Sequence, residues 1–589
     1  MSLKSKISLV FLFVFSSLLA QNRFHVTPDG SNTADGLSWA NSISIERAFN
    51  LIYANENDEI WIKQGTYSIT ETLEITLFTD QVKIYGGFVG NETSLTQRDW
   101  ENNLTVLDGN TTTQILSTYG KNVTIDGLIF QNGYFTSGTS SRLGGAISAG
   151  GDNVIINNCI FKSNYSETYG GAICASTWEK TIINNSTFED NHSMNDGGAI
   201  SITTSFSITN SKFINNSTQN DGGAIHSYSE EEGIISNSTF VGNTATLYGG
   251  AMWIDGNNTE INNCIFESNQ SDISGGAIYA WEELIINNCI FDNNQSKDLG
   301  GAIYNSTFAA ITNSKFMNNS TQGDGGAIYN LCFYEGGLFG LFIINSLFQQ
   351  NDATRGGAIF NDTEISITNS TFIGNTNTAL LHSDANTRST TVYNSIFYQN
   401  TSIGAGYRAD ISPQYLESDQ SDKDIRYNIV QEYDLGTYNM IGVDPKFVNN
   451  TSDFRLQTSS PAINVGNNNL YNAVSPVAIG ASTDLAGNPR LYGTAIDYGA
   501  YELQEEMDIV DLDRPILNFY PNPVIDFLTI STKKNIEEIS VFNTSGQKVL
   551  NSTNVRNGKI DVSSLPSGIY VFQVKMEDKK VETIKVIKK

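Results

Sequence analysis

The chain is short of positive charge, cysteine, proline and long apolar runs. Its 589 residues include 34 Lys and Arg against 62 Asp and Glu, which gives a formal net charge of −28 and a pI of about 4.4. Such an acidic chain is a poor partner for nucleic acid or an anionic membrane. The 5 cysteines form no disulfide framework and show no zinc-ligand spacing. No apolar run reaches the about 20 residues of a transmembrane helix, so no transmembrane segment is expected.

The N-terminus has the features of a secretory signal peptide. Lys4 and Lys6 precede an apolar run from Ile7 to Leu19, which is followed by Ala20. Residues 1–20 are therefore predicted to be a signal peptide. The residue directly after the predicted cleavage site is Gln21 and not a cysteine, so no lipid anchor is expected there.

What the chain has in abundance is a repeated tetrapeptide, Gly-Gly-Ala-Ile (once Gly-Gly-Ala-Met). Its copies begin at Gly144, Gly170, Gly197, Gly222, Gly249, Gly275, Gly300, Gly325 and Gly356. Subtracting neighbours gives steps of 26, 27, 25, 27, 26, 25, 25 and 31 residues. A period of this size indicates a stack of units that are each too small to bury their own apolar face. A solenoid is predicted, with its function on the outside or at the ends.

A second motif, Phe-x-x-Asn, runs in phase with the first. An Asn always lies three residues before the Phe, and an Ile or Val lies five residues before it. Side chains five apart in a straight strand face opposite ways, so an Ile and a Phe that both face the core require a bend between them. Asn suits that bend because it tolerates left-handed geometry. The motif begins at Phe161, Phe188, Phe213, Phe240, Phe266, Phe291, Phe316, Phe348, Phe372 and Phe397.

These spacings predict an all-β chain. The repeat is rich in β-branched residues, Gly and Asn and poor in helix formers. Stacked coils would place equivalent Asn side chains about 4.8 Å apart, where their amides can hydrogen-bond along the rod. The predicted fold is a right-handed parallel β-helix, a single-stranded solenoid with about 25 residues per coil, followed by a small C-terminal β-sandwich.

The repeats resemble those of known β-helix families. Asn ladders and coils of this length are similar to the pectate-lyase-like right-handed β-helix. The paired tetrapeptides resemble the repeats of the chlamydial polymorphic outer-membrane proteins, which are surface adhesins. The resemblance covers roughly residues 144–400 and implies a surface rod without specifying one activity.

The chain is predicted to have six segments. They are a signal peptide (1–20), an N-terminal cap with the first coils (21–110), the parallel β-helix repeat core (111–410), irregular C-terminal coils and a cap (411–503), an acidic linker (504–516) and a C-terminal domain (517–589). Residues 45–53 form the best helical segment and are expected to cap the first coil, whose edge would otherwise be open. The Gly-rich aromatic insertion at 333–341 is predicted to protrude as a loop.

The C-terminal domain carries the most specific resemblance. Its motifs are similar to those of the type A C-terminal sorting domain of the type IX secretion system. That resemblance implies a Bacteroidetes-type bacterium, the secretion machinery as a partner, and a protein that is secreted or attached to the outer-membrane surface. The alternative is an ordinary β-sandwich binding module. The motifs are Tyr520-Pro521-Asn522-Pro523, Ser545-Gly546-Gln547-Lys548, Leu565-Pro566-Ser567-Gly568-Ile569-Tyr570 and Lys585-Val586-Ile587-Lys588-Lys589.

The candidate binding residues follow the tetrapeptide in five successive copies. If the Ile of the tetrapeptide points inward, alternation turns the next residue outward. Aromatic faces suit the C–H bonds of sugar rings, so the hypothesis is a glycan-contact stripe. The alternative is an aromatic stack that stiffens the sheet. The residues are Trp253, Tyr279, Tyr304, Tyr329 and Phe360.

An enzyme is the rival class. A β-helix lyase needs a basic residue beside carboxylate-bound calcium, but no two adjacent coils stack Lys or Arg. Asp196 and Asp221 do stack one residue before Gly-Gly, in a turn where Asp is favoured anyway; a weak calcium site there stays open, and no other cofactor is expected. Cys264 and Cys289 share a column, either as a disulfide or as buried thiols in the place of Ser.

The favoured function is therefore non-catalytic. The sequence predicts an adhesin or polysaccharide-binding protein of the cell surface, with a polysaccharide or a host or cell-surface glycan as its partner. The alternative is a lyase or glycoside hydrolase that acts on an acidic polysaccharide.

Overall fold

The computed structural model describes much of the chain. The described residues are 22–52, 57–136, 143–177, 179–229, 231–256, 258–331, 340–383, 389–402, 404, 407–413, 423–432, 436–473, 482–504, 518–520, 524–531, 536–543, 547–552, 559–576 and 581–589. The predicted signal peptide, nearly all of the predicted linker (504–516) and most of the insertion at 333–341 lie outside them. The chain divides into two compact units, residues 1–504 and 505–589, and each is described by itself.

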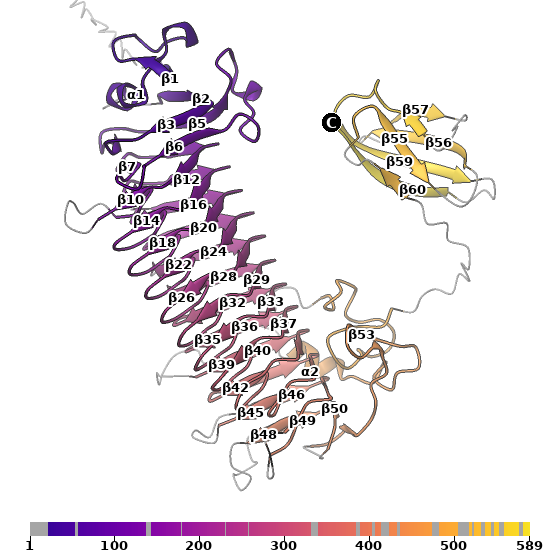
Figure 1. Cartoon of the computed structure of the whole chain (residues 1–589). Coiled ribbons are helices and arrows are strands. Elements are labelled where there is room, and N and C mark those ends of the chain that lie inside the picture. The colour runs from indigo at the N-terminus through magenta and orange to yellow at the C-terminus, as the bar shows by residue number, and fades with distance from the viewer. Residues whose placement is uncertain are drawn as a thin grey trace, which may run out of the picture. The chain divides into compact units, whose positions relative to one another are not determined.

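The first unit is a parallel β-helix, as predicted (Figure 1). One coil contains β12 (Val154–Asn157), β13 (Ile160–Lys162), β14 (Tyr165–Ser166) and β15 (Ile173–Ala175). The chain then starts the next coil with β16 (Lys180–Asn184), which pairs with β12 in parallel. Each strand thus pairs with its equivalents one coil before and one coil after it.

Four parallel sheets result within the described residues. Sheet 1 has 15 strands, sheet 2 has 15, sheet 3 has 8 and sheet 4 has 13. Sheet 1 runs from β1 (Arg23–Ser31) to β49 (Lys423–Arg426), and sheet 2 runs from β3 (Gly65–Ser68) to β51 (Met440–Ile441). Sheet 3 runs from β10 (Tyr134–Phe135) to β38 (Ser320–Thr321), and sheet 4 runs from β4 (Leu73–Ile75) to β48 (Ile411–Pro413).

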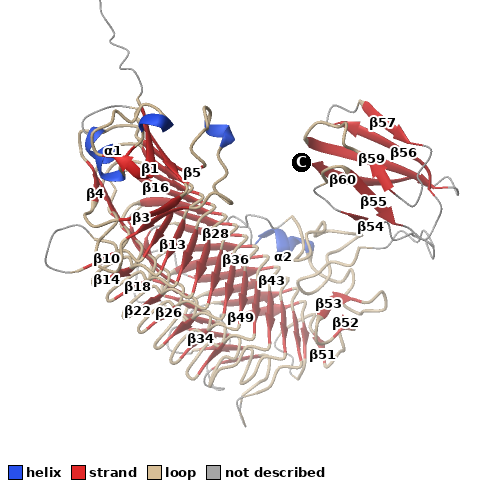
Figure 2. Cartoon of the chain, turned by 45° about the horizontal axis from the view of Figure 1, so that its top comes forward, coloured by secondary structure: helices blue, strands red, loops and turns tan. Residues whose placement is uncertain are grey.

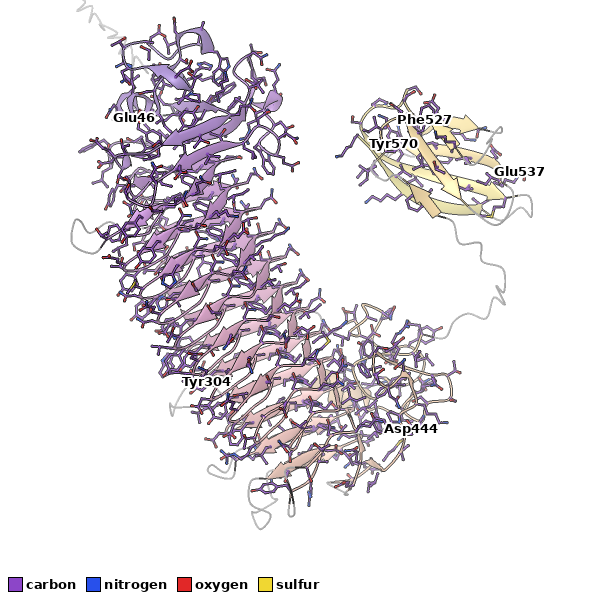
Figure 3. The ribbon with its side chains drawn as sticks, in the orientation of Figure 1. Glu46, Tyr304, Asp444, Phe527, Glu537 and Tyr570 are labelled. Carbon is purple, nitrogen blue, oxygen red and sulfur yellow. The ribbon has the colours of Figure 1, made fainter. Side chains whose placement is uncertain are left out.

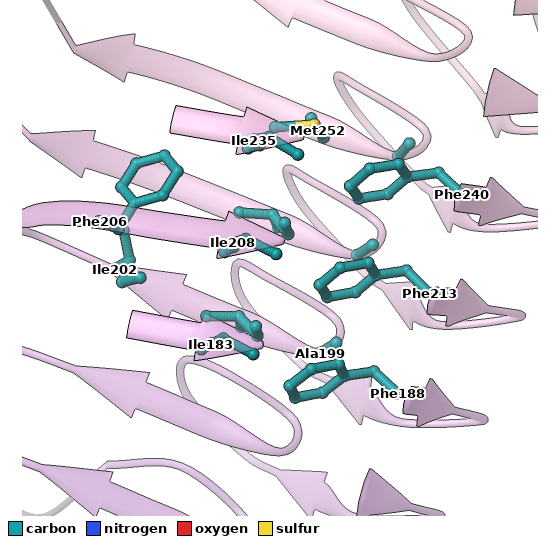
Figure 4. Packing of buried hydrophobic residues seen from close by; sticks show 14 of the residues in the cluster. Ile183, Phe188, Ala199, Ile202, Phe206, Ile208, Phe213, Ile235, Phe240 and Met252 are labelled. Carbon is teal, nitrogen blue, oxygen red and sulfur yellow. The ribbon is translucent and has the colours of Figure 1, made fainter. Parts of the chain in front are cut away.

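The core repeats coil by coil. Ile183, Phe188 and Ala199 are each 0 % exposed, and Figure 4 shows equivalent residues directly above them. The rings of Phe188 and Phe213 stack with centroids 4.8 Å apart and 3° between their planes. The predicted bend between Ile and Phe is present, because the Asn at that corner has a positive φ, 48° for Asn185.

A second Asn column is buried. The Asn of each Phe-x-x-Asn motif lies inside the solenoid and forms a ladder from Asn164 to Asn400. Asn243 is typical: its Nδ2 donates to Phe213 O at 3.0 Å and to Asn269 Oδ1 at 2.9 Å, while its Oδ1 accepts from Asn216. The buried amides are thus paired with backbone and with each other, which a low-dielectric interior requires.

The Gly-Gly pair is required by close approach of the backbone. Gly275 has φ +68°, and a Cβ there would lie 2.4 Å from Ile278 O. A Cβ on Gly276 would lie 2.0 Å from Gly301 O in the next coil. Only glycine fits both positions, which explains why the pair recurs.

The N-terminal end is covered by a helix, close to the predicted position. Helix α1 (Ile45–Leu51) starts at the N-cap Ser44 and buries Ile45, Ala48 and Phe49 against the first coils. Two short 3-10 helices, η1 (Trp39–Asn41) and η2 (Leu95–Gln97), lie in the loops nearby.

The C-terminal segment, whose described residues are 442–473 and 482–504, packs on the outside of the last coils (Figure 1). It contains the antiparallel pair β52 (Phe447–Asn449) and β53 (Asp453–Leu456) and helix α2 (Asn468–Ala473). Buried Arg490 holds the segment together by donating to Asp497 O and Gly499 O, both at 2.8 Å.

The second unit consists of two antiparallel sheets with their own core, which agrees with the predicted β-sandwich (Figure 2). The core includes Leu528, Val541 and Phe572. The smaller sheet is β54 (Asn518–Tyr520), β55 (Phe527–Ser531) and β58 (Lys559–Asp561). The larger sheet is β57 (Lys548–Ser552), β56 (Ile536–Asn543), β59 (Gly568–Met576) and β60 (Val581–Lys588).

The buried ladder gives the first testable prediction. Asn243→Ala removes the buried hydrogen bonds that the Asn243 amide makes with Asn216, Phe213 and Asn269, so it should destabilise the β-helix by about 2–4 kcal/mol. Thermal unfolding followed by circular dichroism checks this, with Thr244→Ala, an exposed neighbour, as the control. Equal unfolding midpoints for the two variants would show that the ladder contributes little to stability.

Candidate functional site

The predicted aromatic column forms a ring stack on the outer side of sheet 4. Tyr279 and Tyr304 stack with centroids 4.4 Å apart, Tyr304 and Tyr329 with 5.4 Å, and Tyr329 and Phe360 with 5.2 Å. Trp253 pairs with Tyr279 along the backbone. The five strands are β27 (Met252–Gly256), β31 (Ile278–Ala280), β35 (Ile303–Asn305), β39 (Ile328–Asn330) and β42 (Ile359–Asn361).

The column points away from the core, as predicted, but it is not the open strip that the hypothesis requires. Tyr279 is 7 %, Tyr304 4 % and Phe360 4 % exposed, while Trp253 and Tyr329 are half-buried. Residues of the turn before Gly-Gly cover the rings: Tyr248 lies 4.6 Å from Tyr279 between ring centroids. Burial accordingly raises the pKa of Tyr329 to about 12.

A small polar cluster lies at one end of this column. The His226 ring stacks on Trp253 at 4.4 Å, and its Nε2 lies 4.0 Å from Asp196 Oδ2. Burial lowers the pKa of His226 to about 4, so the ring is neutral at pH 7 and forms no ion pair. Burial, followed by the charge of Asp196, raises the pKa of Asp221 to about 7. The Asp196 pKa is raised as well, chiefly by burial.

This cluster lacks the partners of a catalytic site. A raised carboxyl pKa is typical of a general acid, but these two carboxylates accept backbone N–H groups inside the turn: Asp196 Oδ1 from Asp221 at 3.3 Å and Asp221 Oδ1 from Tyr248 at 3.1 Å. Arg355 and Asp324 occupy the same turn position, directly before Gly-Gly, in two later coils. Arg355 Nε donates to Asp324 at 2.8 Å, so its guanidinium is already paired. No group of three His, Cys, Asp or Glu that could hold a metal ion occurs among the described residues.

The two stacked cysteines are free thiols. Cys289 Sγ accepts from the Cys264 backbone N–H at 3.3 Å, just as Ser238 Oγ accepts from Ser211 N at 3.1 Å. In the structure, therefore, thiols occupy the place of Ser hydroxyls.

A groove runs along the corner between sheets 1 and 2. Two cavities of about 320 Å³ and 240 Å³ lie along this corner: Asn158, Asn185 and Asn210 line the first, Asn263, Asn288 and Asn313 line the second, and the coil of exposed Asn237 separates them. One column in the groove is the corner Asn, at Asn158, Asn185, Asn210, Asn237, Asn263, Asn288 and Asn313. The other column, on the sheet 2 strands, is Ile160, Thr187, Lys212, Thr239, Ile265, Ile290 and Lys315. We call the surface over these two columns the corner groove.

Sequence reasoning missed this groove, although it identified the corner Asn. The sequence signal for the groove is the Asn that lies three residues before every Phe of the repeat. The sequence predicted hydrogen bonds between stacked Asn amides along the rod, and such bonds are present at this corner, but the continuous buried ladder is the other Asn column. Two neighbouring pairs of corner side chains are hydrogen-bonded on the outside: Asn185 Nδ2 donates to Asn158 Oδ1 at 2.7 Å and Asn288 Nδ2 to Asn263 Oδ1 at 2.7 Å.

The groove and the aromatic column lie on different sides. Figure 3 labels Tyr304 on one side of the solenoid and Asp444, in the C-terminal segment, on the other. The C-terminal segment borders the corner groove, because Leu485 lines its second cavity.

Family models match three stretches of the chain. Residues 518–589 match the secretion system C-terminal sorting domain, residues 170–335 the right-handed β-helix region, and residues 158–176 the Chlamydia polymorphic membrane protein repeat. These matches confirm the resemblances found in the sequence. The sorting domain identifies the chain as cargo of that secretion system, secreted or attached to the cell surface. In the described part of the chain no helix has the length and apolarity of a membrane span.

Solved structures with a similar chain trace include several enzymes. Pectate lyase Pel9A shares 13 % identity over 82 % of this chain and 98 % of its own, with a TM-score of 0.27. The PL6 family alginate lyase AlyGC shares 12 % identity over 71 % and 53 %, with a TM-score of 0.38. XylC in complex with xylose shares 9 % over 81 % and 98 %, with a TM-score of 0.31. At these values the likeness carries no information on activity. No curated protein sequence matches the chain.

The carboxylate pair predicts a pH dependence. The pKa of Asp221 is about 7 in the fold against 3.8 for the free side chain, so between pH 4 and 7 the folded state holds a proton that the unfolded state has lost. Stability should therefore fall as pH rises through that window. Asp221→Asn should flatten the fall and raise stability at pH 8 by roughly 1–3 kcal/mol.

Unfolding midpoints of the wild type and the variant between pH 4 and 8 test this. Asp298→Asn, an exposed turn residue, is the control. Parallel pH profiles for the wild type and Asp221→Asn would contradict the assignment.

Proposed function

We propose that this protein is a non-catalytic adhesin of the cell surface that binds polysaccharide or a host or cell-surface glycan. The observation that carries the proposal is the corner groove, which lies along the solenoid axis and whose two cavities are lined by six of the seven corner amides from Asn158 to Asn313. A site that repeats with the coil suits a ligand that itself repeats. Polysaccharides are such ligands, and an exported surface protein meets them.

The chemistry of the groove supports a sugar ligand. An amide has two N–H donors and a carbonyl acceptor, which match hydroxyl groups in both directions. Next to the amides lie Ile265, which is 38 % exposed, and Ile290. Aliphatic side chains of this kind can pack on the C–H face of a sugar ring. The aromatic column is a second candidate site of contact with the glycan, because Trp253 and Tyr329 are only half-buried.

Catalysis is the less favoured function. A lyase or hydrolase for an acidic polysaccharide would need an accessible acid or base. Asp221, whose pKa of about 7 would suit a general acid, lies in the turn before Gly-Gly, where its Oδ1 accepts from the Tyr248 N–H. Arg355 is held by Asp324. We therefore assign no catalytic residue.

The full secreted chain should bind polysaccharides without cutting them. A glycan array and affinity electrophoresis measure binding, and reducing-end and unsaturated-product assays on the same polysaccharides measure cleavage. Binding without new ends supports the proposal. New reducing or unsaturated ends that disappear in Asp221→Asn would replace it with the enzyme alternative, and a chain that binds no glycan would overturn it.

A further inference from the structure

We infer that the corner groove between Asn158 and Asn313 binds an uncharged, extended glycan strand that lies parallel to the solenoid axis. This inference rests on the proposed function and specifies its site and its ligand class. It comes from comparing the open stretch of the groove with its continuation in the last coils, where the same surface is occupied.

In the last coils the chain itself fills the groove. The corner residues Asn345, Asn369 and Asn394 are each 0 % exposed, whereas the five equivalents from Asn185 to Asn288 are exposed. Their amides bind the backbone of the C-terminal segment: Asn345 Nδ2 donates to Thr483 O at 2.8 Å, Asn369 Nδ2 to Asp497 O at 2.8 Å, and Asn394 Oδ1 accepts from Asn467 N at 2.8 Å. The corner amides are thus able to hold a chain that runs past successive coils.

The second column explains why the C-terminal segment occupies only these coils. In the occupied stretch the column continues as Leu347, Thr371 and Ile396. Leu347 and Ile396 are buried under apolar side chains such as Phe447 and Tyr498. Here the column offers an almost continuous apolar strip, which suits hydrophobic anchors of a polypeptide.

The open stretch has a different second column. Thr187, Lys212, Thr239 and Lys315 interrupt its three isoleucines, so apolar anchors find no continuous strip. Short aliphatic patches beside amides suit a ligand with alternating C–H faces and hydroxyl groups. The lysine stems extend these patches, because such stems pack on apolar surface while the ammonium stays in water. These properties favour a glycan over a polypeptide.

The distribution of charge favours an uncharged glycan. Lys212 and Lys315 are four coils apart, which is about 19 Å at one strand spacing of about 4.8 Å per coil, and Glu101 lines the upper cavity. A uronic acid polymer carries a carboxylate on every residue and would meet two ammonium groups in the lining of the two cavities, in a protein with a net charge of −28. Repulsion over the rest of its length would outweigh those two contacts.

The length of the open stretch follows from the repeat. Seven corner Asn span six coil steps, or about 29 Å. The stretch ends at Trp100 and Glu101 in one direction and at Leu485 in the other. The upper loop is fixed there by Arg98, whose Nη2 donates to Asp126 at 2.7 Å. A bound strand should therefore contact about one sugar per coil over several coils.

Two triple variants test the site in the full chain. The groove variant is Asn237→Gly, Asn263→Gly and Asn288→Gly, and the control is Asn215→Gly, Asn293→Gly and Asn318→Gly at the next corner, outside the groove. All six residues are exposed and have φ between 51° and 56°, which glycine adopts freely. Equal thermal unfolding midpoints for the two variants establish that both fold alike. Ile265→Glu is a further variant, which places a charge in the groove without altering a corner.

Calorimetric titration uses soluble xylan and glucomannan as uncharged probes and polygalacturonate and alginate as acidic ones. We expect the groove variant and Ile265→Glu to lose about tenfold or more in affinity for an uncharged probe, as three hydrogen bonds would contribute, and the control to stay within about twofold of the wild type. An unchanged affinity in the groove variant would overturn the site while leaving the proposed function intact. Binding confined to the acidic probes, or displacement of the glycan by an extended peptide that binds more tightly, would overturn the ligand class. Failure to bind any glycan would remove the proposed function itself.

Discussion

The structure depends on one constraint: every side chain of a coil lies one strand spacing from the same side chain of the next coil. Neighbouring parallel strands are about 4.8 Å apart, so each position meets copies of itself. Phenylalanine tolerates this because rings stack, and Phe291 and Phe316 do so with parallel planes, 4.7 Å apart. Asparagine tolerates it because an amide is complementary to itself, as the pair Asn269 and Asn294 shows at 2.9 Å. The composition of the repeat follows from these two self-complementary groups.

The same constraint acts on charged residues in the opposite sense. Like charges that recur at one position repel each other: Asp196 and Asp221 stack, and part of the raised pKa of Asp221 comes from the charge of Asp196. At another position opposite charges are neighbours: Lys162 and Glu189 are 3.1 Å apart on paired strands. Because like charges repel at this spacing, neutral polar columns are favoured on the surface of such a solenoid. These columns are suited to neutral ligands.

The sequence allowed the period, the corner at Asn, the Gly-Gly turn and the core columns to be predicted, since each depends on contacts between equivalent residues. It did not allow us to predict which of the two Asn columns is buried, because both recur with the same period. Nor did it show that Tyr248, in the turn before Gly-Gly, packs on Tyr279, since the path of a turn does not follow from spacing. The contacts of the C-terminal segment could not be predicted either, because Asn345 and Thr483 are 138 residues apart and Thr483 lies outside the repeats.

Stacking also explains why a column of amides is a better binding surface here than a column of aromatic rings. A stacked ring uses both faces on its neighbours, as Tyr304 does between Tyr279 and Tyr329, and leaves only an edge for a ligand. Sugars, however, bind to ring faces. A stacked amide uses one N–H and one lone pair within the ladder and keeps the others for a partner. In the last coils those remaining groups hold the C-terminal segment, so their capacity to bind a second chain is already in use within the molecule.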